Sequence, residues 1–338
     1  MTPTVSAVLL AFGPEPWLAD AVTAVLASAD VDIEVIVVDN GCTSDAVGLV
    51  KGLDGVRVIT PDVNTGFAGG CDRGAAEATG EYLAFVNSDA IVAPGALSRL
   101  VAVAAEPGVG LAMGSIRLAD SPELMNSAGN PLHYVGLSWA GGFEEPAARY
   151  AQRRSVTLAS GCCFAVRRDL WHELGGFAPE YFCYCEDTEL SLRIWQRGLT
   201  VQFIPDAVVR HHYEFSRNKL KLYLLERNRV ILLLTTYQRR SLAVLAPMLL
   251  VTELLMLAAA VSDGWGRAKV SGWQWIWQHR DWIRARRALI QRERSVPDAV
   301  IFRQVTARID PANVAAPPGV GILNAIMGSY WAVARRLL

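Results

Sequence analysis

Acidic and imidazole side chains follow three apolar runs of the chain, a spacing that suits metal and nucleotide chemistry. Asp39 comes directly after such a run, Asp89 follows a second run by way of Asn87-Ser88, and the pair His211-His212 comes after a third. Carboxylates bind Mg²⁺ and Mn²⁺, and Mn²⁺ also accepts imidazole. These residues predict a site for a nucleotide and a divalent cation, in which Asp89 and one of the two histidines bind the metal.

A glycine-rich segment, Asn64-Thr65-Gly66-Phe67-Ala68-Gly69-Gly70, lies between the two aspartates in sequence. Glycines let backbone amides approach a phosphate closely, and Arg73 would add charge-assisted contacts. A plain tight turn is the alternative interpretation. The segment matches neither G-x-G-x-x-G nor the P-loop pattern, so neither a dinucleotide-binding fold nor a P-loop enzyme is indicated.

The acidic cluster Glu186-Asp187-Thr188-Glu189 follows the aromatic run 181–184 and opens a segment with helical spacing. Acidic residues at a helix start are often explained by capping and by the helix dipole. The functional alternative is a general base that faces a cleft, in aromatic surroundings that restrict water.

The elements that must position these residues alternate between strands and helices. We expect strands at 5–10, 33–38, 56–60, 82–86 and 200–204, and helices at 17–28 and 71–78. Strands without polar alternation, separated by helices, predict an α/β fold with a mostly parallel sheet covered on both faces, and ligands bind beyond the carboxyl ends of such strands. Residues 108–154 show weak periodicity and predict short strands and acceptor-facing loops.

The character of the chain changes after His212, and we predict two domains, 1–216 and 217–338. Residues 1–216 contain 13 basic and 26 acidic side chains, whereas residues 217–338 contain 19 and 7, a net charge of +12. A basic and strongly apolar region favours an anionic membrane face or an anionic ligand over nucleic acid.

Helices are expected at 223–236 and 242–261, and the second is just long enough to span a bilayer. It contains Pro247 and Glu253, so three interpretations stay open: helices in the membrane interface, a true span, or an ordinary helical domain or homodimer interface. Five tryptophans resemble an interfacial belt: Trp265, Trp273, Trp275, Trp277 and Trp282.

The cysteines and the first residues predict a reducing, cytoplasmic setting. None of the six cysteines forms a C-x-x-C pair, and Met1-Thr2-Pro3 lacks the basic start of a signal peptide.

Together these motifs resemble glycosyltransferase family 2, which has the GT-A fold, and are most similar to its bacterial rhamnosyltransferase-like branch. The resemblance covers about residues 4–216 and rests on seven segments in order: 37–40, 64–70, 81–89, 160–164, 175–177, 184–193 and 205–212.

The resemblance implies a role for each matching residue. Asp187 matches the catalytic base, and Asp89 and His211 match the metal ligands. The nucleotide-binding positions are Phe12, Gly13, Asp39, Asn64, Gly66, Phe67, Gly69, Arg73, Asn87 and Ser88. The acceptor-side positions are Gly161, Glu186 and Glu189. Asn87 departs from the family pattern, because it stands where the metal motif usually has its first aspartate.

The function implied is inverting, metal-dependent transfer of a sugar, with rhamnose as the first choice, from a dTDP- or UDP-sugar. The expected cation is Mg²⁺ or Mn²⁺, and the expected acceptor is a hydroxyl of a lipid-linked or cell-envelope glycan. The protein would be peripheral or C-terminally anchored at the cytoplasmic face of the membrane. A nucleotidyltransferase and a non-catalytic membrane scaffold are the alternatives.

Overall fold

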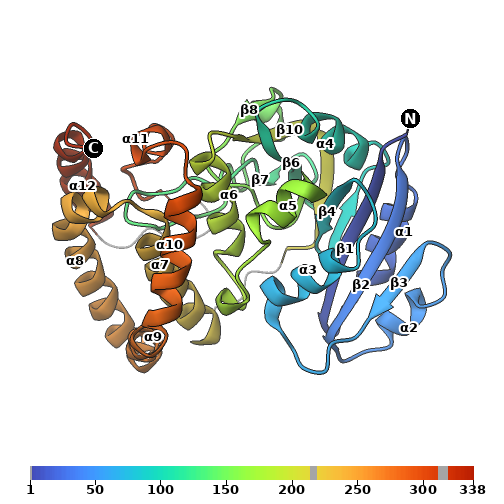
Figure 1. Ribbon diagram of the computed structural model, residues 1–338, viewed down its shortest axis with the longest axis horizontal. Helices are drawn as coiled ribbons and strands as arrows, with labels where there is room; N and C mark the ends of the chain where they lie inside the picture. Colours follow the sequence, from blue (N-terminus) through green and yellow to red (C-terminus); the bar gives the residue numbers. More distant parts are fainter. Residues whose placement is uncertain (1, 214–218, 311–318) are drawn as a thin grey trace. The chain divides into compact units, whose positions relative to one another are not determined.

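The structure is a computed structural model that describes residues 2–213, 219–310 and 319–338 (Figure 1). The chain divides into two units: the first comprises 1–130, 140–194 and 199–214, and the second comprises 131–139, 195–198 and 215–338. The predicted boundary between residues 216 and 217 lies outside the described residues. The segments 131–139 and 195–198, predicted for the first domain, group with the second unit.

The first unit is built on a mixed sheet with the order β3-β2-β1-β4-β9-β6-β10-β5, to which β7 and β8 are also paired. The strands are β1 (Thr4–Gly13), β2 (Asp32–Cys42), β3 (Val56–Ile59), β4 (Tyr82–Val86), β5 (Ala90–Val92), β6 (Val109–Leu118), β7 (Met125–Ser127), β8 (Arg154–Ser155), β9 (Cys163–Arg167) and β10 (Thr200–His211). Strands β3, β2, β1 and β4 run parallel, while β9 is antiparallel to both β4 and β6.

Helices of the first unit pack against this sheet. They are α1 (Leu18–Leu26), α2 (Ala46–Val50), α3 (Gly66–Ala76), α4 (Ala96–Ala104), α5 (Arg168–Leu174) and α6 (Glu186–Gln196), with the short 3₁₀ turns η1 (Ala147–Tyr150) and η2 (Pro179–Tyr181). All residues of β4 are buried, as expected for a strand covered on both faces. The α/β fold class is confirmed.

Strand β6 corrects the expectation that the strands of residues 108–154 are short. It is a long strand that pairs with β10 and β9, yet it contains two glycines that weaken its strand pattern. A Cβ at Gly110 would lie 2.4 Å from Ile194, and one at Gly114 would lie 2.9 Å from the Ala207 carbonyl oxygen. Close packing therefore requires glycine where propensity would favour another residue.

The second unit is helical, with α7 (Lys219–Thr236), α8 (Arg239–Ser262), α9 (Gly266–Gln278), α10 (Arg280–Glu293), α11 (Asp298–Ile301) and α12 (Val320–Ala334). The predicted helices at 223–236 and 242–261 are confirmed as parts of α7 and α8. One buried cluster joins the segment 131–139 to α8 and α12, through side chains that include Tyr134, Leu245, Met248 and Trp331.

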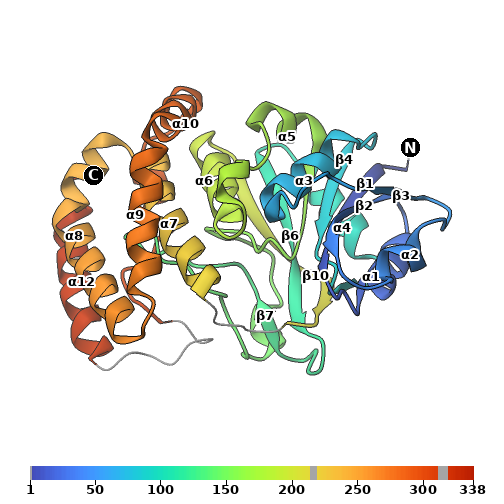
Figure 2. The same ribbon diagram turned by 90° about the horizontal axis from the view of Figure 1, so that it is seen from below.

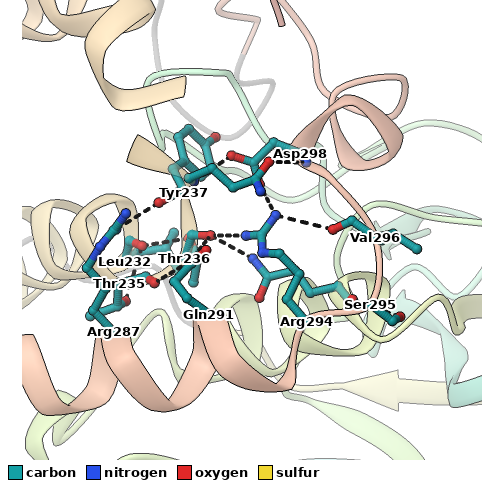
Figure 3. A network of polar contacts seen from close by, with 12 residues as sticks. Leu232, Thr235, Thr236, Tyr237, Arg287, Gln291, Arg294, Ser295, Val296 and Asp298 are labelled. Atoms are coloured by element: carbon teal, nitrogen blue, oxygen red, sulfur yellow. Dashed lines mark hydrogen bonds and ion pairs between the residues drawn. The ribbon is translucent and has the colours of Figure 1, made fainter. Parts of the chain in front are cut away.

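The carboxyl end of α7 is capped by polar side chains that follow it in sequence by about 50 residues (Figure 3). Arg287 donates to the Tyr237 carbonyl oxygen at 2.7 Å, and Gln291 donates to the carbonyl oxygens of Thr235 and Thr236 at 3.0 Å. Arg294 donates to the Thr236 carbonyl oxygen and to Asp298. Cations at a helix carboxyl end stabilise it, so these basic residues have a structural role.

The predicted tryptophan belt is mostly packed inside the second unit. Trp265 is buried, Trp273 donates to Glu253 at 3.0 Å, and the Trp275 ring stacks on His279. Among these indoles Trp277 is the most exposed, at 68%.

Candidate active site

The carboxyl ends of β1, β2 and β4 carry the predicted nucleotide-binding residues. Ala11 of β1 pairs in register with Asp39 of β2, and the N–H of Thr43 donates to the Gly13 carbonyl oxygen at 2.7 Å. The Asp39 carboxylate accepts the N–H of Cys42 at 2.9 Å, which fixes its orientation where the strand ends. Phe12 is 58% exposed and lies over Gly41, where a Cβ would come within 3.5 Å of its ring.

Asn40, which the sequence interpretation did not single out, holds the glycine-rich segment in place. Its buried side chain donates to Asn64 Oδ1 at 2.9 Å and to the Gly66 carbonyl oxygen at 3.1 Å, and it accepts the N–H of Thr65 at 3.0 Å. Its position directly after Asp39 at a strand end was the available signal. The segment is therefore tied to β2 by one amide side chain.

Gly66, Gly69 and Gly70 belong to α3, which corrects the expectation of a glycine-rich turn followed by a helix at 71–78. Gly66 has φ +71°, and a Cβ there would lie 2.2 Å from the Phe182 carbonyl oxygen; at Gly70 it would lie 2.1 Å from Leu10. At Gly69 it would lie 2.9 Å from Thr65. All three glycines are buried, so close packing explains them without a ligand. Phe67 is half-buried, and Arg73 is exposed in the last turn of α3.

Asp89 and His211, which are distant in sequence, are brought together by the sheet. His211 Nε2 lies 3.1 Å from Asp89 Oδ1, and its Nδ1 lies 3.0 Å from Asn126 Oδ1. The strand predicted at 200–204 continues to His211, and the register of β10 on β6 shifts between Ile204 and Val208. Such irregularities redirect the side chains that follow them.

A divalent cation suits the donors at this position. Asn87 Oδ1 is buried and has no hydrogen-bond partner, and it belongs to the same strand-end segment as Ser88 and Asp89. Within the described ranges no group of three or more His, Cys, Asp or Glu side chains forms a complete metal site. Mg²⁺ is commonly bound by one or two carboxylates together with substrate phosphates, so a small protein ligand set fits it.

Glu15 is a second residue that the sequence interpretation missed. Its carboxylate accepts the N–H of Phe12 at 2.7 Å, and its backbone has φ +46°. Burial raises the pKa of Glu15; hydrogen bonds from Phe12 and Ser88 oppose that shift, and the charge of Asp89 adds to it. An acidic side chain thus lies beside the strand-end segment 87–89.

Asp187 lies in the first turn of α6 and is fixed by three donors. Its Oδ2 accepts the N–H of Gly161 at 2.9 Å, and its Oδ1 accepts the N–H of Thr188 at 2.6 Å and the Thr188 hydroxyl at 3.2 Å. Burial raises the pKa of Asp187, although the Gly161 and Thr188 donors act against that shift. A raised pKa makes a carboxylate a stronger base.

The loop at residues 160–162 connects Asp187 to the strand-end segment 87–89. Gly161 donates to Asp187, and the carbonyl oxygen of the next residue, Cys162, accepts the N–H of Asn87 at 2.8 Å. The segment before α6 contains three non-glycine residues with positive φ: Phe182 at 62°, Tyr184 at 70° and Cys185 at 68°. Such strain persists where the surrounding structure demands it and is typical of functional sites.

The two glutamates of the acidic cluster differ in their surroundings. Glu186 is buried, with an unpaired Oε2, and burial together with the charge of Asp187 raises its pKa well above the ordinary value. Glu189 is fully buried and lies 2.9 Å from Arg193, which also donates to the Gly176 carbonyl oxygen at 3.0 Å. This burial favours a structural role for Glu189 over acceptor binding.

The mixed sheet with acidic residues at its strand ends, and the half-buried Asp187 carboxylate at the start of α6, match the arrangement of a GT-A glycosyltransferase, the fold class of a solved structure described below. The sequence profile named Glycosyl transferase family 2 matches residues 6–175, half of the chain. The protein belongs to this family and is a glycosyltransferase, which decides against the nucleotidyltransferase and scaffold alternatives.

Curated relatives include two bacterial rhamnosyltransferases. One is the N-acetylglucosaminyl-diphospho-decaprenol L-rhamnosyltransferase of Mycobacterium tuberculosis, 25% identical over 243 residues that cover 65% of this chain and 79% of the relative. The other is the O-antigen chain rhamnosyltransferase RfbN of Salmonella typhimurium, 25% identical over 54% of this chain and 58% of the relative.

A solved structure shows the same fold. The crystal structure of GalNAc-T7 with UDP, GalNAc and Mn²⁺ has a TM-score of 0.56 and 19% identity, over 71% of this chain and 49% of that one.

Proposed function

We propose that the protein transfers a sugar, with rhamnose as the first choice, from a dTDP- or UDP-sugar to a hydroxyl of a lipid-linked or cell-envelope glycan, with inversion. The rhamnosyltransferase relatives support the sugar, and the decaprenol-linked substrate in the name of one of them supports the acceptor class. We assign the chemistry to the domain 1–216 and membrane association at the cytoplasmic face to the domain 217–338.

The observation that carries this proposal is the hydrogen-bonded connection from the Asp187 carboxylate through the adjacent residues Gly161 and Cys162 to the Asn87 N–H. It links the candidate base to the candidate metal-binding segment through two adjacent loop residues. In an inverting transfer the base and the leaving group act on opposite sides of one sugar carbon, so both must be held by one rigid frame.

Asp187 would remove the proton of the acceptor hydroxyl as its oxygen attacks the anomeric carbon. The Gly161 N–H and the Thr188 groups hold the carboxylate in one orientation, and its raised pKa favours proton uptake. Asp39 and the backbone at Phe12-Gly13 would bind the nucleobase, with Ser88, Phe67 and Arg73 nearer the rest of the donor. Gly161 and Glu186 would face the acceptor.

Asp89 and His211, with Asn87 beside them, would hold Mg²⁺ or Mn²⁺. Such an ion, when bound, supplies positive charge that stabilises the departing nucleoside diphosphate. The contact between His211 Nδ1 and Asn126 directs Nε2 toward Asp89, so the ligand atom is oriented before any ion arrives.

A transfer assay tests the proposal. The purified protein is incubated with dTDP-rhamnose, UDP-sugars or GDP-mannose, a synthetic polyprenyl-diphosphate-linked acceptor, and either Mn²⁺ or a chelator. We expect nucleoside diphosphate release and a product of inverted anomeric configuration, both lost on chelation. Full activity in the presence of the chelator would contradict the proposed metal requirement. A product with retained anomeric configuration would contradict the assignment of Asp187 as the general base.

A further inference from the structure

Helix α8 exposes an unbroken apolar face. Every residue from Ala243 to Val261 that is exposed is apolar, and the largest are Leu250, Val251, Leu254, Leu255 and Val261. Among the described residues α8 is the one helix long and apolar enough to cross a membrane, yet only 22% of its most apolar window is buried. Monomeric soluble proteins rarely leave so continuous an apolar surface in water.

Helix α12 extends this face. Its exposed side carries Ile322, Ile326 and Val333 at helical spacing, with exposed fractions of 71%, 54% and 61%. The two helices share the buried cluster that contains Met248 and Met327, and Figure 2 shows them side by side in the second unit. We call the exposed apolar residues of α8 and α12 the α8/α12 face.

Glu253, the acidic residue inside α8, points away from this face into a buried ion network. It pairs with Arg229 of α7 and lies 2.8 Å from Lys269 of α9, and both cations also pair with Glu226. Crossing a bilayer would require α8 either to break these pairs or to bring the charged helices α7 and α9 into hydrocarbon, and both are costly. Only the outer side of α8 is therefore suited to lipid.

Basic residues lie at the ends of the two helices. Arg239 and Arg240 are exposed where α8 begins, and Arg335 and Arg336 are exposed after α12 ends. Residues 217–338 contain 19 basic and 7 acidic side chains. Apolar side chains that enter the acyl boundary, with arginines at the level of the headgroups, match a membrane surface that contains anionic lipid.

We propose that the α8/α12 face docks the protein on one leaflet of an anionic membrane, with α8 lying in the plane of the interface rather than spanning the bilayer. This inference specifies the membrane association in the proposed function and rests on it. The α8/α12 face replaces the tryptophan belt as the predicted membrane-contact surface.

Vesicle flotation of the full-length protein tests the docking surface. Vesicles of phosphatidylcholine with phosphatidylglycerol should bind the protein, and vesicles of phosphatidylcholine alone should bind it less. The double variants Leu250→Ser/Leu254→Ser and Ile322→Ser/Ile326→Ser should each bind on the order of 100-fold more weakly, because each apolar side chain removed from lipid costs about tenfold or more.

Two exposed apolar residues of the first unit provide the matched control. Leu49 is 62% exposed and Val63 is 67% exposed, close to the values of 62% for Leu250 and 58% for Leu254. Leu49→Ser/Val63→Ser should bind vesicles like the parent protein. Equal binding by all variants, each with native circular dichroism, would overturn the proposed surface.

Other occupants of the face give different results. A parent protein that is dimeric in light scattering, becomes monomeric in the face variants and ignores vesicles would show that a second copy covers the face. Resistance to alkaline carbonate extraction from cell membranes would show a spanning helix and overturn the in-plane arrangement.

Sugar transfer to a water-soluble acceptor analogue is measured in parallel and should persist in the face variants. If the parent protein transfers no sugar, the proposed function fails, while the vesicle-binding result still tests the docking surface on its own.

Discussion

Each unit of the protein holds two acidic side chains close together, one buried and one half-buried, and the surroundings of the two pairs are opposite. In the first unit, Glu186 and Asp187 are adjacent in sequence, and burial raises the pKa of both. In the second unit, burial opposes ionisation of Glu226 and Glu253, but Arg229 and Lys269 outweigh it and lower the pKa of both.

This difference separates a reactive arrangement from a structural one. Cations compensate the charge of Glu226 and Glu253, so these ion pairs stabilise the packing of α7, α8 and α9. They do not prepare either carboxylate for catalysis. Asp187 instead receives neutral backbone and hydroxyl donors, which orient a carboxylate while leaving it basic. Perturbed carboxylates without a cationic partner are typical of catalytic sites.

The largest expected effect is on stability, from Glu226→Gln. Removing this charge leaves Arg229 and Lys269 with Glu253 as the remaining partner in the network, and breaking a buried pair costs about 3–5 kcal/mol of unfolding free energy. Glu186→Gln is the matched control, because the Glu186 carboxylate has no cationic partner and its burial costs free energy. Denaturant unfolding should show little or no loss of unfolding free energy for Glu186→Gln. Equal losses for the two variants would contradict the proposed difference between the two acidic pairs.

Asp187→Asn should lower turnover about 100-fold or more while the protein stays folded, because a positioned general base contributes at least that factor. The amide can keep the contact with the Gly161 N–H through its oxygen, so the loss would report on proton transfer. Donor hydrolysis and acceptor transfer are measured with thermal unfolding as the check on folding. Near-native turnover would refute the assignment of the base.

Asn126→Ala should raise the Mn²⁺ concentration needed for half-maximal activity by about tenfold, because residues that orient a ligating histidine have effects of this size. Asn126→Asp, which keeps an acceptor for His211 Nδ1, should restore much of the response. A change in turnover at saturating Mn²⁺ with no change in its half-maximal concentration would indicate a merely structural role for Asn126.

The smallest effects concern pH, and the two units should respond in opposite directions. The stability contributed by Glu226 and Glu253 is present above the ordinary pKa of 4.5 and is lost as pH falls through their lowered values. The contribution of Glu186 is complete below 4.5 and is lost as pH rises through its raised pKa. Hydrogen exchange, corrected for intrinsic rates, should show α7 to α9 weakening in acid and α6 weakening toward neutral pH; parallel trends would contradict this.

The sequence by itself determined the α/β class and the residue types at the strand ends, because buried strands and the polar residues that follow them are local patterns. Asp39, Asp89 and Asp187 needed no long-range information to be singled out. The helices 223–236 and 242–261 were predictable for the same reason, since long apolar stretches with helical spacing leave few alternatives.

Only the tertiary structure decided which of these residues meet and which face inward. The pairing of His211 with Asp89 depends on the antiparallel pairing of β10 with β5, in which His211 lies opposite Ala90. The burial of Glu189 depends on Arg193 and its contacts to the chain at 174–176. The inward direction of Glu253 depends on α7 and α9, which leaves the opposite side of α8 exposed. Contacts between distant segments fix these directions, and the local spacing of residues carries no information about them.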